Sequence, residues 1–317
     1  MPIMTYPYST ALIRSLKTAF GLFLASCLLS LNASAQDVDI NKALTPQNAR
    51  AKAQSKQLLE LEFKAVEEKA EMQSGPRLWY AGFGFDSGTV AFRGDVDLTA
   101  QRLSAINPQL ISYKLDNQVQ TRELDRPFAH LGNFQETIKH LGQYVREQDL
   151  VVLLLSSHGN VGYIANQIGN RRYGDIAAHN INTVLYKLKE TPTIIIISAC
   201  YSGSLIPKLE ARNRIILTAA AKDRGSWGCS PLDQNTFFID ALFGDKFDPS
   251  LSLTASFEET KVRVAKREEE KKLTPSNPQI FVGANMREMA HIPLKELLQH
   301  GFKATSGSAT AAAKEAK

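Results

Sequence analysis

Two apolar runs, each leading into a short polar motif, constrain the fold of this chain more than any other feature. The runs are DLVVLLL (149–155) and TIIIIS (193–198), and they lead into SSHG and SACYSGS. Short aliphatic runs without polar alternation are typical of strands buried on both faces of a parallel sheet. Functional crevices of such sheets lie at the carboxyl ends of the strands. We therefore expect His158 and Cys200 to emerge at the same edge of one sheet.

The rest of the chain continues this alternation of strands and helices. The candidate strands are residues 78–85, 110–114, 149–156, 193–199, 214–220 and 279–284. The candidate helices between them are residues 97–106, 133–146, 174–189, 235–243 and 252–272. Short apolar runs that alternate with amphipathic stretches are the α/β pattern. The sequence therefore predicts an open, largely parallel six-stranded sheet with helices on both faces.

The N-terminal residues 1–35 have the three parts of a secretory signal. The basic pair Arg14 and Lys17 precedes a mostly apolar run at 19–31, and Ala33-Ser34-Ala35 follows. A run of this length is too short to span a bilayer, and the final motif is a typical cleavage site. We expect an exported chain, periplasmic or secreted.

A second interpretation of the same segment leaves the protein on a membrane. Leu24-Ala25-Ser26-Cys27 resembles a bacterial lipoprotein box, in which Cys27 would carry the lipid and become the first residue. The leucines after Cys27 are unusual for a lipoprotein start, so cleavage after Ala35 is the favoured alternative.

Three further segments complete the predicted organisation. Residues 36–76 are polar with leucines at helical spacing, which predicts a helical N-terminal extension that docks or acts as a spacer. Residues 77–303 form the predicted α/β domain. Residues 304–317 contain Ala, Ser, Gly and Lys without an apolar face, which predicts a disordered tail.

Composition excludes some function classes. The chain is 44% hydrophobic and 22% charged, which is ordinary for a globular protein. Its net charge is +5, and removal of residues 1–35 leaves 35 basic against 32 acidic residues. This balance does not indicate a nucleic-acid partner. The oligomeric state is left open.

The two motifs together allow nucleophilic catalysis by a thiol. A cysteine attacks as its thiolate, and a nearby imidazole can take the thiol proton and return it to a leaving amine. Ends of neighbouring strands would place the His158 and Cys200 side chains about 5 to 10 Å apart. The N–H groups of Gly159 and Cys200 could together form an oxyanion hole. The Ser-Gly-Ser after Tyr201 allows a tight turn near a helix N-terminus.

Two other uses of these residues stay open. In an oxidising compartment Cys200 could form a disulfide with Cys229, although isolated cysteines are more often buried or reactive. A zinc site from His158, Cys200, Cys229 and His179 lacks any familiar ligand spacing, so neither a metal nor another cofactor is expected.

The motifs resemble the bacterial branch of the legumain family of cysteine peptidases, which shares the caspase-like fold of clan CD. The resemblance rests on SSHG, SACYSGS, ILTAAAKDRGSWGCSPLD (216–233) and TPSNPQIFVGAN (274–285). It spans about residues 78–285. It implies that Cys200 is the nucleophile, His158 the catalytic histidine and Gly159 the oxyanion-hole residue.

The resemblance determines substrate specificity less well. In legumain an acidic residue stands two positions before the nucleophile and lines the pocket for an asparagine side chain, whereas this chain has Ser198 there. Arg93 and Asp233 match two other pocket positions, and Trp227 in the 222–229 loop could form an apolar wall or cap the core. A lost carboxylate would cost selectivity, so asparaginyl preference is not expected.

The sequence thus favours a cysteine endopeptidase that cuts peptide or protein substrates through an acyl-thioester on Cys200. Two alternatives remain. A transpeptidase of the same fold would use an amine in place of water, as the related catalytic subunit that attaches glycolipid anchors does. A catalytically silent interaction module of the cell envelope would explain Ser198 and the added helix.

Overall fold

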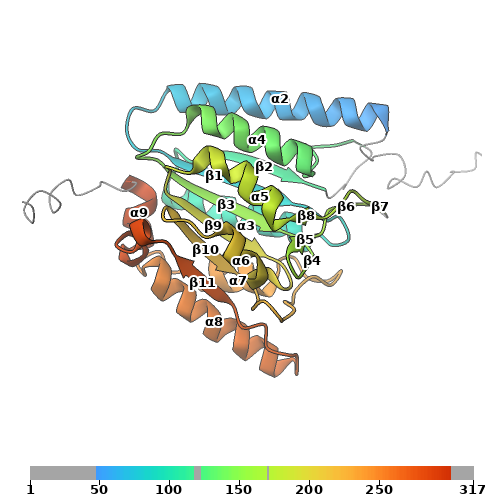
Figure 1. The fold of residues 1–317 in the computed structure, drawn as a ribbon, viewed down its shortest axis with the longest axis vertical. Coiled ribbons are helices and arrows are strands. Elements are labelled where there is room, and N and C mark those ends of the chain that lie inside the picture. The colour runs from blue at the N-terminus through green and yellow to red at the C-terminus, as the bar shows by residue number, and fades with distance from the viewer. Residues whose placement is uncertain (1–47, 118–122, 170, 301–317) are drawn as a thin grey trace, which may run out of the picture. The chain divides into compact units, whose positions relative to one another are not determined.

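The computed structural model describes residues 48–117, 123–169 and 171–300 (Figure 1). The predicted signal segment, the predicted lipid attachment at Cys27 and the tail at 304–317 lie outside these residues. None of the described helices is both long enough and apolar enough to cross a bilayer.

The described domain is built on one six-stranded sheet whose strand order is β11-β10-β9-β3-β1-β2. The strands are β1 (Leu78–Gly84), β2 (Ile111–Asp116), β3 (Leu150–Ser156), β9 (Thr193–Ser198), β10 (Arg214–Thr218) and β11 (Gln279–Val282). All neighbours pair in parallel except β10 with β11, which is antiparallel. The predicted six-stranded, largely parallel sheet is therefore confirmed, and each strand lies at its expected place in the sequence.

Helices cover both faces of this sheet, as predicted. One face packs against α2 (Ala49–Glu71), α4 (Leu131–Tyr144), α5 (Ala178–Leu185) and the short α6 (Ile206–Leu209) (Figure 1). The other face packs against α3 (Ala91–Ile106), α7 (Phe237–Phe243), α8 (Leu253–Glu270) and α9 (Leu294–His300). Side chains alternate between the two cores along each strand: in β1, Trp79 points to the first and Tyr80 to the second. The four central strands β1, β3, β9 and β10 are buried along their whole length and are mostly apolar, whereas the edge strands β2 and β11 are buried only in part.

Helix α3 begins at Ala91, six residues before the predicted start at 97. Gly94 lies in this first part, and a glycine inside a helix argues against helix when only the sequence is considered. The structure explains why position 94 is a glycine. A Cβ atom on Gly94 would collide with the backbone carbonyl oxygen of Gln234, so the glycine lets α3 approach the segment that leads into α7.

Helix α2 lies within the predicted extension and is packed on the domain. Leu59, Val66 and Ala70 belong to the first core, and Asn48 caps the helix by accepting hydrogen bonds from the N–H groups of Arg50 and Ala51. The helix also covers the edge strand β2, where the N–H of Lys114 donates to Glu62 Oε1 at 2.6 Å. Covering an edge strand prevents pairing with other chains. Helix α2 is therefore a docked helix and not a free spacer.

The segment between β3 and α5 differs from the expectation, which placed a helix from residue 174. It contains two small antiparallel sheets. One pairs β4 (Gly159–Asn160), β5 (Tyr163–Ile164) and β8 (Ile176–Ala177), and the other pairs β6 (Gln167–Ile168) with β7 (Arg171–Arg172). Strands of two residues produce no recognisable alternation in the sequence, which is why they were not predicted. Helix α5 therefore begins only at Ala178 and is followed by a 3-10 turn, Tyr186–Leu188.

Candidate active site

His158 and Cys200 follow the carboxyl ends of neighbouring strands at the same edge of the sheet. Strands β3 and β9 are direct parallel neighbours, and Ser156 pairs with Ser198. The pairing continues past the strand ends, since the N–H of Ser157 donates to the carbonyl of Ser198 at 3.1 Å. His158 and Cys200 each follow two residues after the last pair. Because adjacent strands are about 4.8 Å apart, the two residues follow neighbouring strand ends at one edge of the sheet, and their cooperation stays a prediction.

The loop after β10 folds over the Cys200 thiol. The N–H of Ser226 donates to Cys200 Sγ at 3.2 Å, and the Ser226 hydroxyl lies 3.7 Å from the same sulfur. The thiol itself is partly exposed. Cys200 Sγ also lies 3.5 Å from the carbonyl oxygen of Ser226, to which the thiol can donate. The 222–229 loop thus contacts Cys200 directly.

A sharp turn follows Cys200 and orients it. Tyr201 has a φ of 57°, in the left-handed region, and its N–H donates to the carbonyl of Arg224 at 2.7 Å. A non-glycine residue in this region is uncommon and is held by its surroundings. The helix expected after this turn is a single 3-10 turn, Ser202–Leu205, followed by the four-residue α6. A helix dipole therefore contributes little to the Cys200 thiolate.

The His158 ring is exposed and lies against helix α3. Its edge-to-face contact with Phe92 has a centroid distance of 5.1 Å and an interplanar angle of 82°. The carbonyl of His158 accepts a hydrogen bond from the N–H of Ala165 at 2.9 Å. These two contacts position the backbone and the ring of His158 and leave it accessible to a substrate.

Gly159 allows the backbones after β3 and β9 to approach each other closely. A Cβ atom at this position would lie 2.5 Å from the carbonyl oxygen of Cys200 and 3.0 Å from the Cβ of Ala199. Only glycine avoids this collision. The oxyanion-hole role of the Gly159 and Cys200 N–H groups stays a prediction, and the structure places both residues in contact.

Ser198 lies in a buried polar cluster that we call the Asp95 cluster: Asp95, Ser156, Ser198 and Thr236. The Ser198 hydroxyl is 2.8 Å from that of Thr236. Asp95 accepts hydrogen bonds from the hydroxyl of Ser156 (2.7 Å) and from the N–H and hydroxyl of Thr236 (both 2.9 Å). Burial raises the pKa of Asp95 to about 6. Position 198 has no carboxylate, but the carboxylate of Asp95 on α3 belongs to the same cluster. The sequence did not reveal this.

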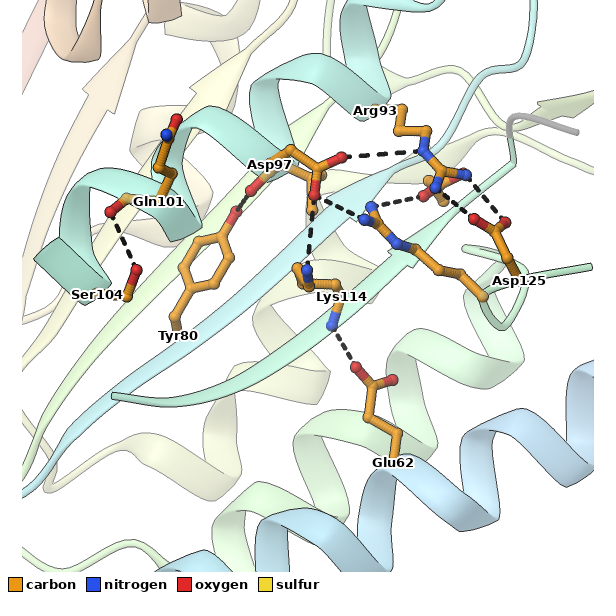
Figure 2. A network of polar contacts seen from close by, with 11 residues as sticks. Glu62, Tyr80, Arg93, Asp97, Gln101, Ser104, Lys114 and Asp125 are labelled. Carbon is orange, nitrogen blue, oxygen red and sulfur yellow. Dashed lines mark hydrogen bonds and ion pairs between the residues drawn. The ribbon is translucent and has the colours of Figure 1, made fainter. Parts of the chain in front are cut away.

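Arg93 has its charge balanced by carboxylates around it. Figure 2 shows its guanidinium group between Asp97 and Asp125, with ion pairs of 3.9 Å to Asp97 and 3.6 Å to Asp116. Arg93 holds the pKa of Asp125 below its ordinary value. The Arg93 side chain is only 11% exposed. A role in the substrate pocket stays a prediction, and a substrate would have to compete with these aspartates.

Trp227 and Asp233 are bound within the loops near Cys200. The indole N–H of Trp227 donates to the carbonyl of Thr274 at 2.9 Å. Asp233 Oδ2 accepts hydrogen bonds from the N–H and the hydroxyl of Ser230, at 2.9 and 2.6 Å. These bonds give both side chains fixed positions. Their assignment to a substrate pocket stays a prediction.

Cys229 is a free thiol, as is Cys200. Burial, together with the charges of Cys200 and Asp233, raises the pKa of Cys229 to about 11. At neutral pH this thiol is protonated and a poor nucleophile. Within the described ranges no three His, Cys, Asp or Glu side chains gather where they could hold a metal ion.

Just under half of the chain matches the model of a known protein family. Residues 131–288 match the Peptidase C13 family. This is the legumain family of cysteine peptidases, so the match supports the predicted clan CD relationship and a cysteine peptidase. The Peptidase C13 region includes His158, Gly159 and Cys200, whereas Arg93 and Asp95 precede it.

The crystal structure of caspase-1 from Spodoptera frugiperda is similar to the chain with a TM-score of 0.42 and 13% sequence identity, over 65% of this chain and 86% of that chain. No curated protein matches the sequence.

Proposed function

We propose that this chain is a cysteine endopeptidase of the bacterial branch of the legumain family, with Cys200 as nucleophile and His158 as general acid and base. The observation that supports it best is the parallel pairing of β3 and β9, because His158 and Cys200 each come two residues after the paired Ser156 and Ser198. The Peptidase C13 match covers both of them.

The proposed reaction has two steps. His158 takes the thiol proton, and Cys200 Sγ attacks the carbonyl carbon of the scissile peptide bond. The oxyanion receives hydrogen bonds from the N–H groups of Gly159 and Cys200. His158 then gives its proton to the leaving amine, and an acyl-thioester remains on Cys200. In the second step water, deprotonated by His158, attacks the thioester and releases the acid and the thiol.

A matched pair of variants tests this function. The chain without residues 1–35 is incubated with a library of proteome-derived peptides, as wild type, Cys200→Ala and Cys229→Ala. We expect cleavage by wild type and by Cys229→Ala, because the Cys229 thiol is protonated at neutral pH. We expect loss of at least about a thousand-fold in Cys200→Ala, the usual effect of removing a nucleophile. Retained cleavage in Cys200→Ala would rule the mechanism out.

The same assay separates the alternatives. Added amine nucleophiles that appear in the products would identify a transpeptidase. A wild-type Cys200 that an iodoacetamide probe labels, while no library peptide is cut, would favour the silent interaction module. The peptides that are cut also give the preference at the residue before the scissile bond. We expect a preference other than asparagine, since the Ser198 hydroxyl is bonded to Thr236 and Arg93 is paired with aspartates.

The proposed location is outside the cytoplasm, and it rests on the sequence of residues 1–35. Mass spectrometry of the mature N-terminus distinguishes its two forms. A chain that starts at Gln36 is periplasmic or secreted. A chain that starts at a diacylated Cys27 is anchored in the envelope.

A further inference from the structure

We propose that Asp86 is a positioning residue for His158 and completes a carboxylate, imidazole and thiol row across three neighbouring strands. The inference deepens the proposed peptidase function and rests on it. Asp86 lies just after β1, outside the Peptidase C13 match.

The register of the sheet places the three residues in a row. Gly84 of β1 pairs with Ser156 of β3, and Ser156 pairs with Ser198 of β9. Two residues after each of these positions are Asp86, His158 and Cys200. The backbones of β1 and β3 stay paired past Gly84, because the N–H of Phe85 donates to the carbonyl of Ser156 at 2.9 Å. The His158 ring contacts Phe92 of α3, so the imidazole lies on the side of the sheet that α3 covers.

Asp86 is buried and held firmly in this position. Its side chain accepts a hydrogen bond from the N–H of Gly88 at 2.6 Å, and the residue is 2% exposed. The flanking backbone is fixed by Gln167, whose N–H donates to the carbonyl of Phe85 and whose carbonyl accepts from Ser87. A buried carboxylate at a fixed place costs free energy unless other charges compensate it.

The charges around Asp86 are those of the candidate site. Burial raises its pKa, and the nearby charges of His158 and Arg172 oppose this rise. The Cys229 thiol, in turn, lies close enough to both Cys200 and Asp86 for their charges to act on it. Asp86 is thus within electrostatic reach of the imidazole and follows the end of β1, which neighbours β3.

This placement gives Asp86 a defined part in the reaction. When His158 takes the Cys200 proton, the ring becomes positively charged. A carboxylate nearby, in surroundings of lower dielectric constant than water, stabilises that imidazolium. Phe92 orients the ring from α3, as its edge-to-face contact shows. Asp86 supplies the negative charge and Phe92 the ring contact.

The alternative is that Asp86 only shapes the turn after β1 through its bond to Gly88. Asp86→Asn separates the two roles, because the amide oxygen still accepts the Gly88 hydrogen bond while the charge is lost. Asp86→Glu keeps the charge and moves it. Asp245→Asn is the control for charge removal, since Asp245 is fully exposed and forms only a surface ion pair with Arg102.

Peptide hydrolysis is measured between pH 5 and 9. For Asp86→Asn we expect kcat/KM to fall about ten-fold with little change in KM, and the alkaline limb of the pH profile to move about one pH unit lower. Asp86→Glu should recover part of the loss, and Asp245→Asn should match wild type. An Asp86→Asn variant that melts like wild type and keeps the wild-type pH profile overturns the proposal.

A second measurement does not depend on turnover. The alkylation rate of Cys200 by iodoacetamide is followed against pH in a Cys229→Ala background, in which Cys200 is the reactive thiol. Asp86→Asn should shift this profile in the same direction as the hydrolysis profile. A shifted profile without any peptide hydrolysis would support Asp86 and reject the peptidase function. An unshifted alkylation profile in Asp86→Asn, together with normal hydrolysis by the wild type, would reject the role of Asp86 and support the peptidase function.

Discussion

Asp95 and Glu62 are two buried acids on helices that cover opposite faces of the sheet, and they differ in how their oxygens are bonded. Both oxygens of Asp95 accept hydrogen bonds, from Ser156 and Thr236 among others. Glu62 accepts one bond from the N–H of Lys114, and its second oxygen is buried without a partner within the described part of the chain (Figure 2). Burial raises both pKa values, to about 6 for Asp95 and about 7 for Glu62.

This difference in hydrogen bonding indicates a different structural role for each acid. Asp95 is surrounded by neutral donors that come from β3 and from the start of α7, so its carboxylate joins elements next to the candidate site. The charges of Arg126 and Lys114 favour ionisation of Glu62 and that of Asp116 opposes it, but burial dominates. Glu62 therefore loses its proton near neutral pH while it covers the edge strand.

The largest effect is expected when the Asp95 cluster loses its acceptor. Asp95→Leu leaves two hydroxyls and the Thr236 N–H without an acceptor, which should lower the free energy of unfolding by about 3 kcal/mol. Asp95→Asn keeps the shape, and the hydroxyls can turn to accept from its amide, so we expect a loss of about 1 kcal/mol. Urea denaturation at pH 7 measures both. Equal losses in the two variants would contradict the importance of the hydrogen bonds.

The contribution of Glu62 to stability should depend on pH. The pKa of Glu62 is about 7 in the folded protein against 4.5 ordinarily, so the folded state binds more protons between these values. Its contribution to stability is therefore present below about pH 4.5 and is lost as pH rises through 7. Glu62→Gln mimics the protonated acid and should be more stable than wild type by about 2 kcal/mol at pH 8, with little difference at pH 4.5.

Glu60→Gln provides the control for this change. Glu60 lies on the same helix with a side chain that is 65% exposed. Denaturation curves at several pH values should show the same pH dependence for Glu60→Gln as for wild type. A pH-independent gain in Glu62→Gln would show that ionisation is not its cause.

A smaller loss of stability is expected at Arg93, because it is one of several charged side chains in its network of ion pairs. Asp116 keeps its 3.0 Å ion pair with Arg126 when Arg93 is replaced. Arg93→Gln should therefore cost only about 1 kcal/mol, and added salt should reduce the difference. Thermal melts at 0.05 and 0.5 M NaCl measure this. A loss as large as that of Asp95→Leu would mean that the aspartates depend on Arg93 alone.

The smallest effect is expected at Ser198. Ser198→Ala removes the bond to Thr236, but the Thr236 hydroxyl still donates to Asp95. We expect a loss of about 0.5 kcal/mol in urea denaturation. A loss near that of Asp95→Leu would show that the Ser198 hydroxyl, and not Asp95, organises the cluster.

Local patterns were sufficient to predict most of the fold. The central strands β1, β3, β9 and β10 are mostly apolar runs, and such runs indicate burial on both faces without reference to the rest of the chain. The start of α3 and the short strands after Gly159 were missed. Gly94 is explained only by its contact with Gln234, which is 140 residues away in the sequence. Two-residue strands have too few positions to show a period.

The sequence by itself identified the candidate catalytic pair. His158 and Cys200 could be identified because each follows a buried strand, and parallel strands end at one edge. Only the tertiary structure decided what surrounds them. It placed β1 beside β3, so that Asp86 and His158 follow neighbouring strands, and it brought Asp95 of α3 and Thr236, which caps α7, to Ser198. Strand order and helix docking depend on packing between distant segments, and no local pattern in a single sequence specifies those contacts.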